Sequence, residues 1–148
     1  MKKVLAFAAL SLIAAASAED KTAPIKDDYT PAGSKATVID LGKVFTGTVF
    51  VEPILGPNNV RNYEMASVTF LPGARSNWHT HPGGGTLYMT SGTGWTQVES
   101  QPKRTIRVGD VIWAPPGITH WHGATDKTAM THLVENAVEN DSVVTWGG

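Results

Sequence analysis

The chain contains no cysteine, which excludes disulfide bonds, cysteine-ligated zinc or iron–sulfur sites, and thiol nucleophiles. It also has no excess of one charge, because 12 lysine and arginine residues face 13 aspartate and glutamate residues, for a net charge of −1. No basic surface for a nucleic acid or a membrane is therefore predicted. The length of 148 residues is enough for one domain, and a hydrophobic fraction of 41% is typical of globular chains.

Helical periodicity is absent beyond the N-terminus, where no stretch keeps apolar residues at the i, i+3, i+4, i+7 spacing. Fifteen glycines and nine prolines instead divide the chain into short β-branched and aromatic runs. The runs predicted as strands are 38–41, 44–52, 63–71, 86–90, 94–99, 104–108, 111–114, 119–123, 129–135 and 142–146. Short strands with no helices between them predict an all-β fold, closed into a barrel or packed as a sandwich.

Residues 1–18 have the pattern of a secretory signal peptide. Lys2 and Lys3 precede an apolar stretch, and the small residues Ala16-Ser17-Ala18 then form a cleavage site. The apolar stretch is too short to span a membrane. We expect an exported protein, periplasmic or secreted, with no membrane association after cleavage. Residues 19–36 are predicted as a flexible leader and residues 37–148 as the β-barrel domain.

All five histidines fall in three short segments: His79 and His81, His120 and His122, and His132. A spacing of two on a strand places both imidazoles of a pair on the same face. Two neutral imidazoles on one face can bind a divalent cation, and a neighbouring strand can add further ligands. Without cysteine the donors would be nitrogen and oxygen only, which suits Mn, Fe, Ni, Co, Cu or Zn. A metal site is therefore predicted.

The spacing around the histidine pairs is more specific than the pairs themselves. Gly73 is followed by five residues and then by His79-Thr80-His81, with a further glycine at 92; Gly109 is followed by five residues, Pro115-x-Gly117, two residues and His120. These blocks resemble the two motifs of the cupin superfamily, G-x5-H-x-H…G and G-x5-P-x-G-x2-H. The resemblance implies a single-domain cupin, an all-β jelly-roll barrel also called a double-stranded β-helix.

A narrower resemblance concerns the stretches 45–49, 70–75, 78–82, 109–113, 120–124 and 128–132. They are similar to small cupins grouped with carboxymuconolactone decarboxylases, and especially to manganese-dependent bacterial (R)-hydroxynitrile lyases. This resemblance implies a lyase that cleaves a small cyanohydrin such as mandelonitrile into an aldehyde and hydrogen cyanide. It implies that His79, His81 and His120 bind the metal, preferably manganese, and that His122 and His132 transfer protons. It also implies a homo-oligomer, a dimer or tetramer.

One position departs from that family. Its members usually have a glutamine four residues after the second motif histidine as the fourth metal ligand, and this chain has Gly85 there. The centre then has three protein ligands with water beside them, or His122 replaces the missing donor. Two other functions stay open, an oxygen-using cupin with iron and a non-catalytic binder of a metal or small molecule. Trp78, Trp113 and Trp121 flank the motifs, either as pocket walls or as ordinary packing residues.

Overall fold

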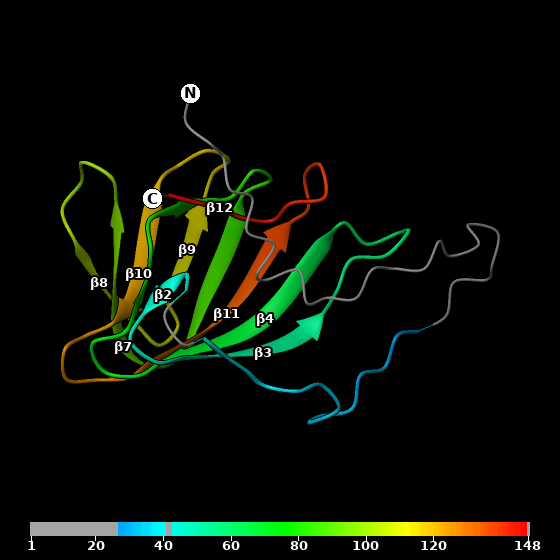
Figure 1. Cartoon of the computed structure of the whole chain (residues 1–148), viewed down its shortest axis with the longest axis horizontal. Helices are drawn as coiled ribbons and strands as arrows, with labels where there is room; N and C mark the ends of the chain where they lie inside the picture. Colours follow the sequence, from blue (N-terminus) through cyan, green and yellow to red (C-terminus); the bar gives the residue numbers. More distant parts are fainter. Residues whose placement is uncertain (1–26, 41–42, 148) are drawn as a thin grey trace.

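The computed structural model describes residues 27–40 and 43–147 (Figure 1). The predicted signal peptide and the first part of the predicted leader lie outside the described residues. The rest of the leader, residues 27–36, contains no strand. Within it, Asp28 forms an ion pair with Arg61, whose Nη2 lies 2.9 Å from the carboxylate Oδ2.

The described part of the chain contains twelve strands, and every pairing between them is antiparallel. Their bounds are β1 Val38–Asp40, β2 Phe45–Thr46, β3 Val49–Leu55, β4 Tyr63–Phe70, β5 Arg75–Ser76, β6 His79–Thr80, β7 Gly85–Val98, β8 Arg104–Arg107, β9 Val111–Ala114, β10 His120–Ala124, β11 Met130–Ala137 and β12 Thr145–Trp146. The described residues include no helix, and thus none that could cross a bilayer. The all-β prediction is confirmed.

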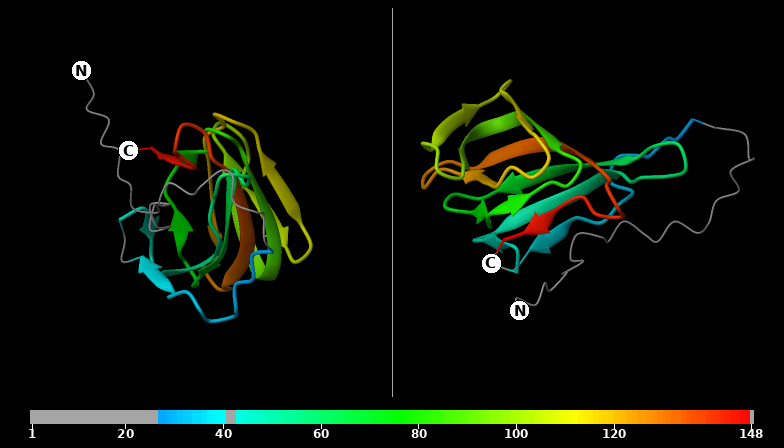
Figure 2. Two further views of the ribbon diagram at one scale, coloured as in Figure 1. Left: turned by 90° about the vertical axis from the view of Figure 1, so that its right-hand side faces the viewer. Right: turned by 90° about the horizontal axis from the view of Figure 1, so that it is seen from above.

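The strands form a curved, nearly closed barrel in the order β1-β3-β4-β11-β7-β10-β5-β2 (Figures 1 and 2). β8 and β9 pair with β7, and β6 pairs with both β10 and β12. One side of the barrel is therefore built on β3, β4, β11 and the first half of β7, and the other on β10 and its partners. Chain segments far apart in sequence meet inside it.

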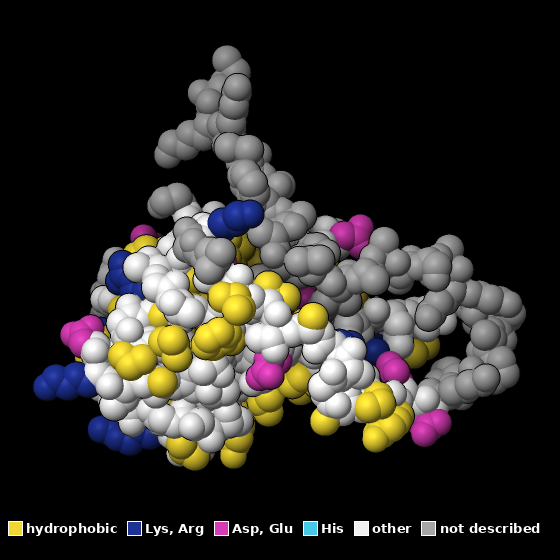
Figure 3. All heavy atoms as spheres, turned by 60° about the horizontal axis from the view of Figure 1, so that its bottom comes forward, with side chains coloured by type: hydrophobic (Ala, Val, Ile, Leu, Met, Phe, Trp, Pro, Cys, Tyr) yellow, Lys and Arg dark blue, Asp and Glu magenta, His cyan; other side chains and the backbone are white. Residues whose placement is uncertain are grey.

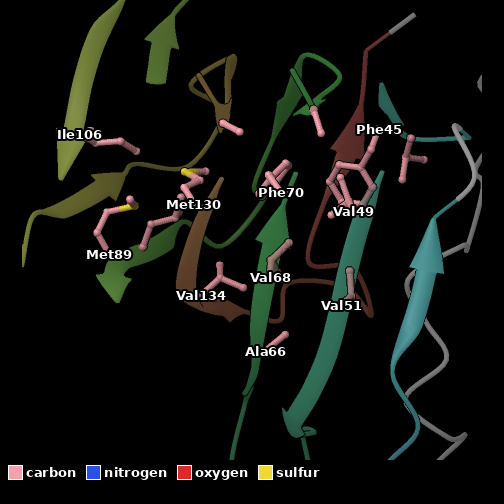
Figure 4. Close-up of a cluster of buried hydrophobic side chains, with 14 residues drawn as sticks. Phe45, Val49, Val51, Ala66, Val68, Phe70, Met89, Ile106, Met130 and Val134 are labelled. Atoms are coloured by element: carbon pink, nitrogen blue, oxygen red, sulfur yellow. The ribbon is translucent and has the colours of Figure 1, made fainter. Parts of the chain in front are cut away.

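Every second side chain along the strands points into the barrel, and these side chains fill its interior. On β4 and β11 every second residue is buried, and the register places inward residues of the two strands opposite each other, as in the pairs Phe70–Met130 and Val68–His132. Val49, Phe70 and Met89 have no exposed surface. Figure 4 shows these side chains with the rest of the apolar cluster between the strands. Such burial is the main source of stability for a barrel of this size.

The central strand β7 serves both sides of the barrel. Residues Gly85–Gly92 pair with β11, and Gly94–Val98 pair with β10. The inward residues change from odd numbers, such as Leu87 and Met89, to even numbers, such as Thr96, across an irregular stretch at 90–93. This bulge bends β7 from one side to the other. The two runs predicted at 86–90 and 94–99 are therefore halves of one strand.

Candidate metal centre

All five histidines are buried inside the barrel. His79 lies on β6, His81 directly after it, His120 and His122 on β10, and His132 on β11. None has more than 6% of its surface exposed, and none is visible on the face of the molecule shown in Figure 3. β6 pairs with β10 so that His79 lies opposite His120. Strand pairing therefore brings together the two pairs that were recognised by their spacing.

The five rings form one continuous cluster. The centroid of the His79 ring lies 4.3 Å from that of His120, 5.0 Å from that of His81 and 5.1 Å from that of His122. The rings of His122 and His132 are 4.9 Å apart. The order in space thus runs from His81 through His79 and His120 to His122 and His132.

Three of the histidines share one hydrogen-bond pattern. The Nδ1 atom of His79 donates to the carbonyl of Asn77 at 2.8 Å, that of His81 to the carbonyl of Val143 at 2.8 Å, and that of His120 to the carbonyl of Ile118 at 3.0 Å. Because a carbonyl can only accept, the proton sits on Nδ1 and the lone pair on Nε2. Metal-bound histidines are commonly oriented in this way.

The free Nε2 atoms are the observation that tests whether a metal fits. Among the described residues, the buried Nε2 atoms of His81 and His120 have no hydrogen-bond partner. Buried polar atoms without partners are rare and destabilising, so a ligand bound to these atoms would stabilise the site. A divalent transition metal suits several neutral nitrogen donors that converge in this way. The residues present therefore fit a metal.

The distances between donor atoms group a slightly different set of histidines. Within the described ranges, one donor atom each of His79, His120 and His122 lies within 4.8 Å of the other two. This group shares His79 and His120 with the predicted ligands and has His122 in place of His81. The hydrogen-bond pattern favours His81, whereas the spacing favours His122, which the sequence offered as the alternative ligand.

Burial makes every imidazole in the cluster neutral at pH 7. Loss of hydration, together with repulsion from His120, lowers the pKa of His79 to about 3. Burial lowers the pKa of His81 and of His132 to about 4. The pKa of His120 and that of His122 are also lowered, mainly by burial. Neutral imidazoles can bind a metal or accept a proton.

The residues predicted to transfer protons lie together at one end of the cluster. His122 and His132 both contact Phe70, whose ring stacks on His132 with centroids 5.8 Å apart and meets the edge of His122 at 5.7 Å. The Nδ1 atom of His122 and the Nε2 atom of His132 are buried, and no hydrogen bond within the described structure engages them. Both atoms are thus buried without a hydrogen-bond partner among the described residues.

Two of the tryptophans that flank the motifs, Trp78 and Trp121, pack edge to face on each other, with ring centroids 6.4 Å apart. Trp121 points away from its neighbours His120 and His122, donates a hydrogen bond from Nε1 to Gln97 and lies under the guanidinium of Arg75. Trp113 is 58% exposed. Trp146 of β12 contacts the cluster, and its ring centroid lies 4.9 Å from that of His79. The pairing of β12 with β6 positions it, and sequence spacing gives no sign of that pairing.

Two polar residues buried in the barrel interior were not predicted from the sequence. Asn136 of β11 and Glu64 of β4 are buried inside the barrel, and Asn136 Nδ2 donates to Glu64 Oε1 at 3.4 Å. Burial raises the pKa of the Glu64 carboxyl. The available signal was weak: each is a polar residue at a position that alternates in step with buried apolar residues such as Val68 and Val134.

Comparison with known proteins agrees with this architecture. Residues 66–135 match the family model of the cupin domain. Over 114 residues the chain is 46% identical to a protein named (R)-mandelonitrile lyase from Granulicella tundricola, covering 77% of this chain and 87% of the relative.

Solved structures show the same fold. A cupin-like protein from Thermotoga maritima is similar with a TM-score of 0.69 and 36% identity, over 82% of this chain and 90% of that one. A cupin-2 domain protein from Rhodospirillum rubrum has a TM-score of 0.64 at 17% identity, over 85% of this chain and 83% of that one. The motif spacing, the barrel and these relatives agree, and the chain belongs to the cupin family.

Proposed function

We propose that this cupin is a metal-dependent lyase that cleaves cyanohydrins such as mandelonitrile into an aldehyde and hydrogen cyanide. The observation that carries the proposal is the 46% identity to a protein named (R)-mandelonitrile lyase, over 87% of that relative. The cluster of five neutral, buried imidazoles supports it, because the reaction needs both metal ligands and groups that move a proton.

The histidines divide into two roles. His79, His81 and His120 would hold a divalent cation, manganese in our proposal, through their Nε2 atoms. When bound, the cation supplies Lewis acidity to the hydroxyl oxygen of the substrate and lowers the pKa of that hydroxyl. The carbonyls of Asn77, Val143 and Ile118 keep the three rings in the orientation that this role requires.

His122 and His132 would carry the proton. One of these neutral imidazoles accepts the hydroxyl proton as the carbonyl bond of the aldehyde forms. The bond between the two carbons breaks, and cyanide leaves with its electron pair. The resulting imidazolium returns the proton to cyanide, so that hydrogen cyanide and aldehyde are released and the imidazole is neutral again. Phe70, packed against both rings, keeps them in place.

The test combines metal analysis with a cyanide assay. Purified protein loaded with manganese should release equal amounts of benzaldehyde and cyanide from mandelonitrile. His79→Ala should lose both bound metal and activity, whereas His122→Ala and His132→Ala should keep the metal and lose at least about a hundredfold in kcat. Thr80→Ala, between two of the histidines on the same segment, is the matched control and should behave like the parent.

The outcomes separate the competing functions. A parent that binds manganese but releases no cyanide would refute the lyase proposal. Iron as the bound metal, with oxygen consumed during turnover, would favour an oxygenase-type cupin. A protein that takes up no metal under any of these conditions would leave a non-catalytic binder as the better description.

A further inference from the structure

Three residues on adjacent strands form one row across the barrel interior. Asn136 of β11 pairs with Glu64 of β4 on one side and with Gly85 of β7 on the other. Side chains at these positions point inward, because all three residues are buried and β11 alternates strictly up to Asn136. Gly85 is the position at which the resemblance to hydroxynitrile lyases implies a glutamine ligand, and glycine has no side chain that could serve as a donor. Its neighbours in the row are a carboxamide and a carboxyl group.

The side chain of Asn136 lies in the space that a side chain at position 85 would use. A Cβ atom added to Gly85 would lie 2.5 Å from Asn136 Oδ1 and 3.2 Å from Cδ2 of His81. The amide oxygen of Asn136 and the ring of His81 therefore border the same small space, at one end of the histidine cluster. A side chain at position 85 and the present position of Asn136 exclude each other.

The two polar atoms of the Asn136 carboxamide differ in their hydrogen bonding. Nδ2 donates to Glu64 Oε1, while Oδ1 is buried and accepts no hydrogen bond from any described residue. Asn136 is only 5% exposed, so bulk water does not compensate for this. An unpaired buried carbonyl oxygen is costly, and a neighbouring cation would remove that cost.

We propose that Asn136 supplies the fourth protein donor of the metal centre through Oδ1, in place of the side chain that Gly85 lacks. The inference rests on the proposed metal-dependent function. Amide oxygens are suitable donors for manganese and other hard divalent cations. Glu64 is a positioning residue: it accepts from Nδ2, which leaves Oδ1 turned toward the histidines.

The experiment measures Mn²⁺ binding directly, by calorimetry and by manganese electron paramagnetic resonance on metal-stripped protein. Asn136→Leu keeps the size and removes the donor, and it should weaken Mn²⁺ binding by about tenfold to a hundredfold. Asn59→Leu, on the exposed β3–β4 hairpin, makes the same chemical change away from the site and should leave binding unchanged.

Two further variants keep the test decisive if Asn136→Leu fails to fold. Asn136→Asp retains an oxygen donor and adds a charge beside Glu64, so it should unfold at a lower temperature without metal and be stabilised more than the parent by Mn²⁺. The double variant Asn136→Ala/Gly85→Gln restores a donor from β7 and should bind Mn²⁺ within a few fold of the parent, unlike Asn136→Ala alone.

The possible results distinguish the ligand role of Asn136 from the metal centre and the lyase activity. If Asn136→Leu is folded and binds Mn²⁺ as tightly as the parent, Asn136 is not a ligand, and the metal centre and lyase proposal remain. If the parent itself binds no Mn²⁺, the ligand role of Asn136 is also refuted. Full Mn²⁺ binding without cyanide release would overturn only the lyase activity.

Discussion

The backbone N–H of His122 donates to Oγ of Ser76 at 3.1 Å, across the contact between β10 and β5. Ser76 is 1% exposed, so water cannot take its place. Ser76→Ala should therefore leave a buried N–H without an acceptor and lower the free energy of unfolding by about 1–3 kcal/mol. Urea unfolding of the two proteins measures the difference.

Ser76→Ala should also lower the rate of the proposed reaction. His122 loses one of the contacts that fix its strand, so kcat for the proposed cleavage of mandelonitrile should fall more than KM rises. Ser67→Ala, on the outward side of β4, serves as the comparison and should change stability by less than about 0.5 kcal/mol. Equal stability of Ser76→Ala and the parent would show that the hydroxyl is not needed as an acceptor.

At the scale of a strand, the course of β7 depends on Gly92. This residue has φ of +74°, and a Cβ there would overlap the backbone carbonyl of Ala129. Gly109 also has a positive φ, +90°, but nothing lies near its missing Cβ. Gly109→Ala should cost about 1–2 kcal/mol from backbone strain alone, and Gly92→Ala should cost clearly more, because a backbone atom must also move.

Thermal and urea unfolding of the two alanine variants would measure this comparison. Because β7 joins both sides of the barrel, Gly92→Ala should also reduce the slope of the urea transition if one side loosens before the other. Equal losses of stability in both variants would mean that the close approach of Ala129 to Gly92 is unimportant.

Sequence pattern predicted the strands where a run of β-branched residues is bounded by turns, as at Val111–Ala114, which was predicted with its observed bounds. It joined β2 and β3 into one run, although Gly47, with φ of +79°, separates them. β5 and β6 have two residues each, too few to show any periodicity. Their existence depends on pairing with distant strands, which local pattern does not contain.

The candidate site, like the strands, was only partly predictable from the sequence. The histidine cluster was predictable, because spacing within a strand puts His79 with His81 and His120 with His122, and the two motifs imply that their strands are neighbours. Asn136 was not predictable, because its place beside Gly85 depends on the register of β11 against β7. The spacing of residues along the chain does not reveal which residues become neighbours through the pairing of distant strands.

At the scale of the whole molecule, five buried neutral histidines make stability depend on pH. In the unfolded chain they bind protons near pH 6.5, whereas in the metal-free folded protein the pKa of His79 is about 3 and those of His81 and His132 are about 4. Between these values the unfolded state binds more protons, so stability must fall as pH falls from about 7 toward 4.

The size of this effect is large for one domain. A single histidine whose pKa falls to about 4 costs about 3 kcal/mol over this range. Glu64 opposes the trend, because its pKa is raised and it takes up a proton more readily when folded, but it is one group against five. Urea unfolding of metal-stripped protein at pH 7.5, 6.5 and 5.5 should show a steadily falling midpoint. A constant midpoint over this range would show that the histidines are not buried as neutral groups.

The sequence pattern at the N-terminus bears on the cellular location of the protein. We propose that residues 1–18 direct export and are removed, because a charged start, a short apolar stretch and Ala16-Ser17-Ala18 together form a cleavable signal. Expressed with its full N-terminus in a Gram-negative host, the protein should be recovered from the periplasm with Glu19 as its first residue, as shown by mass spectrometry. Replacing Lys2 and Lys3 by glutamate should keep it in the cytoplasm with residues 1–18 still attached. Recovery of an uncleaved chain from the cytoplasm in both cases would overturn the proposal of export.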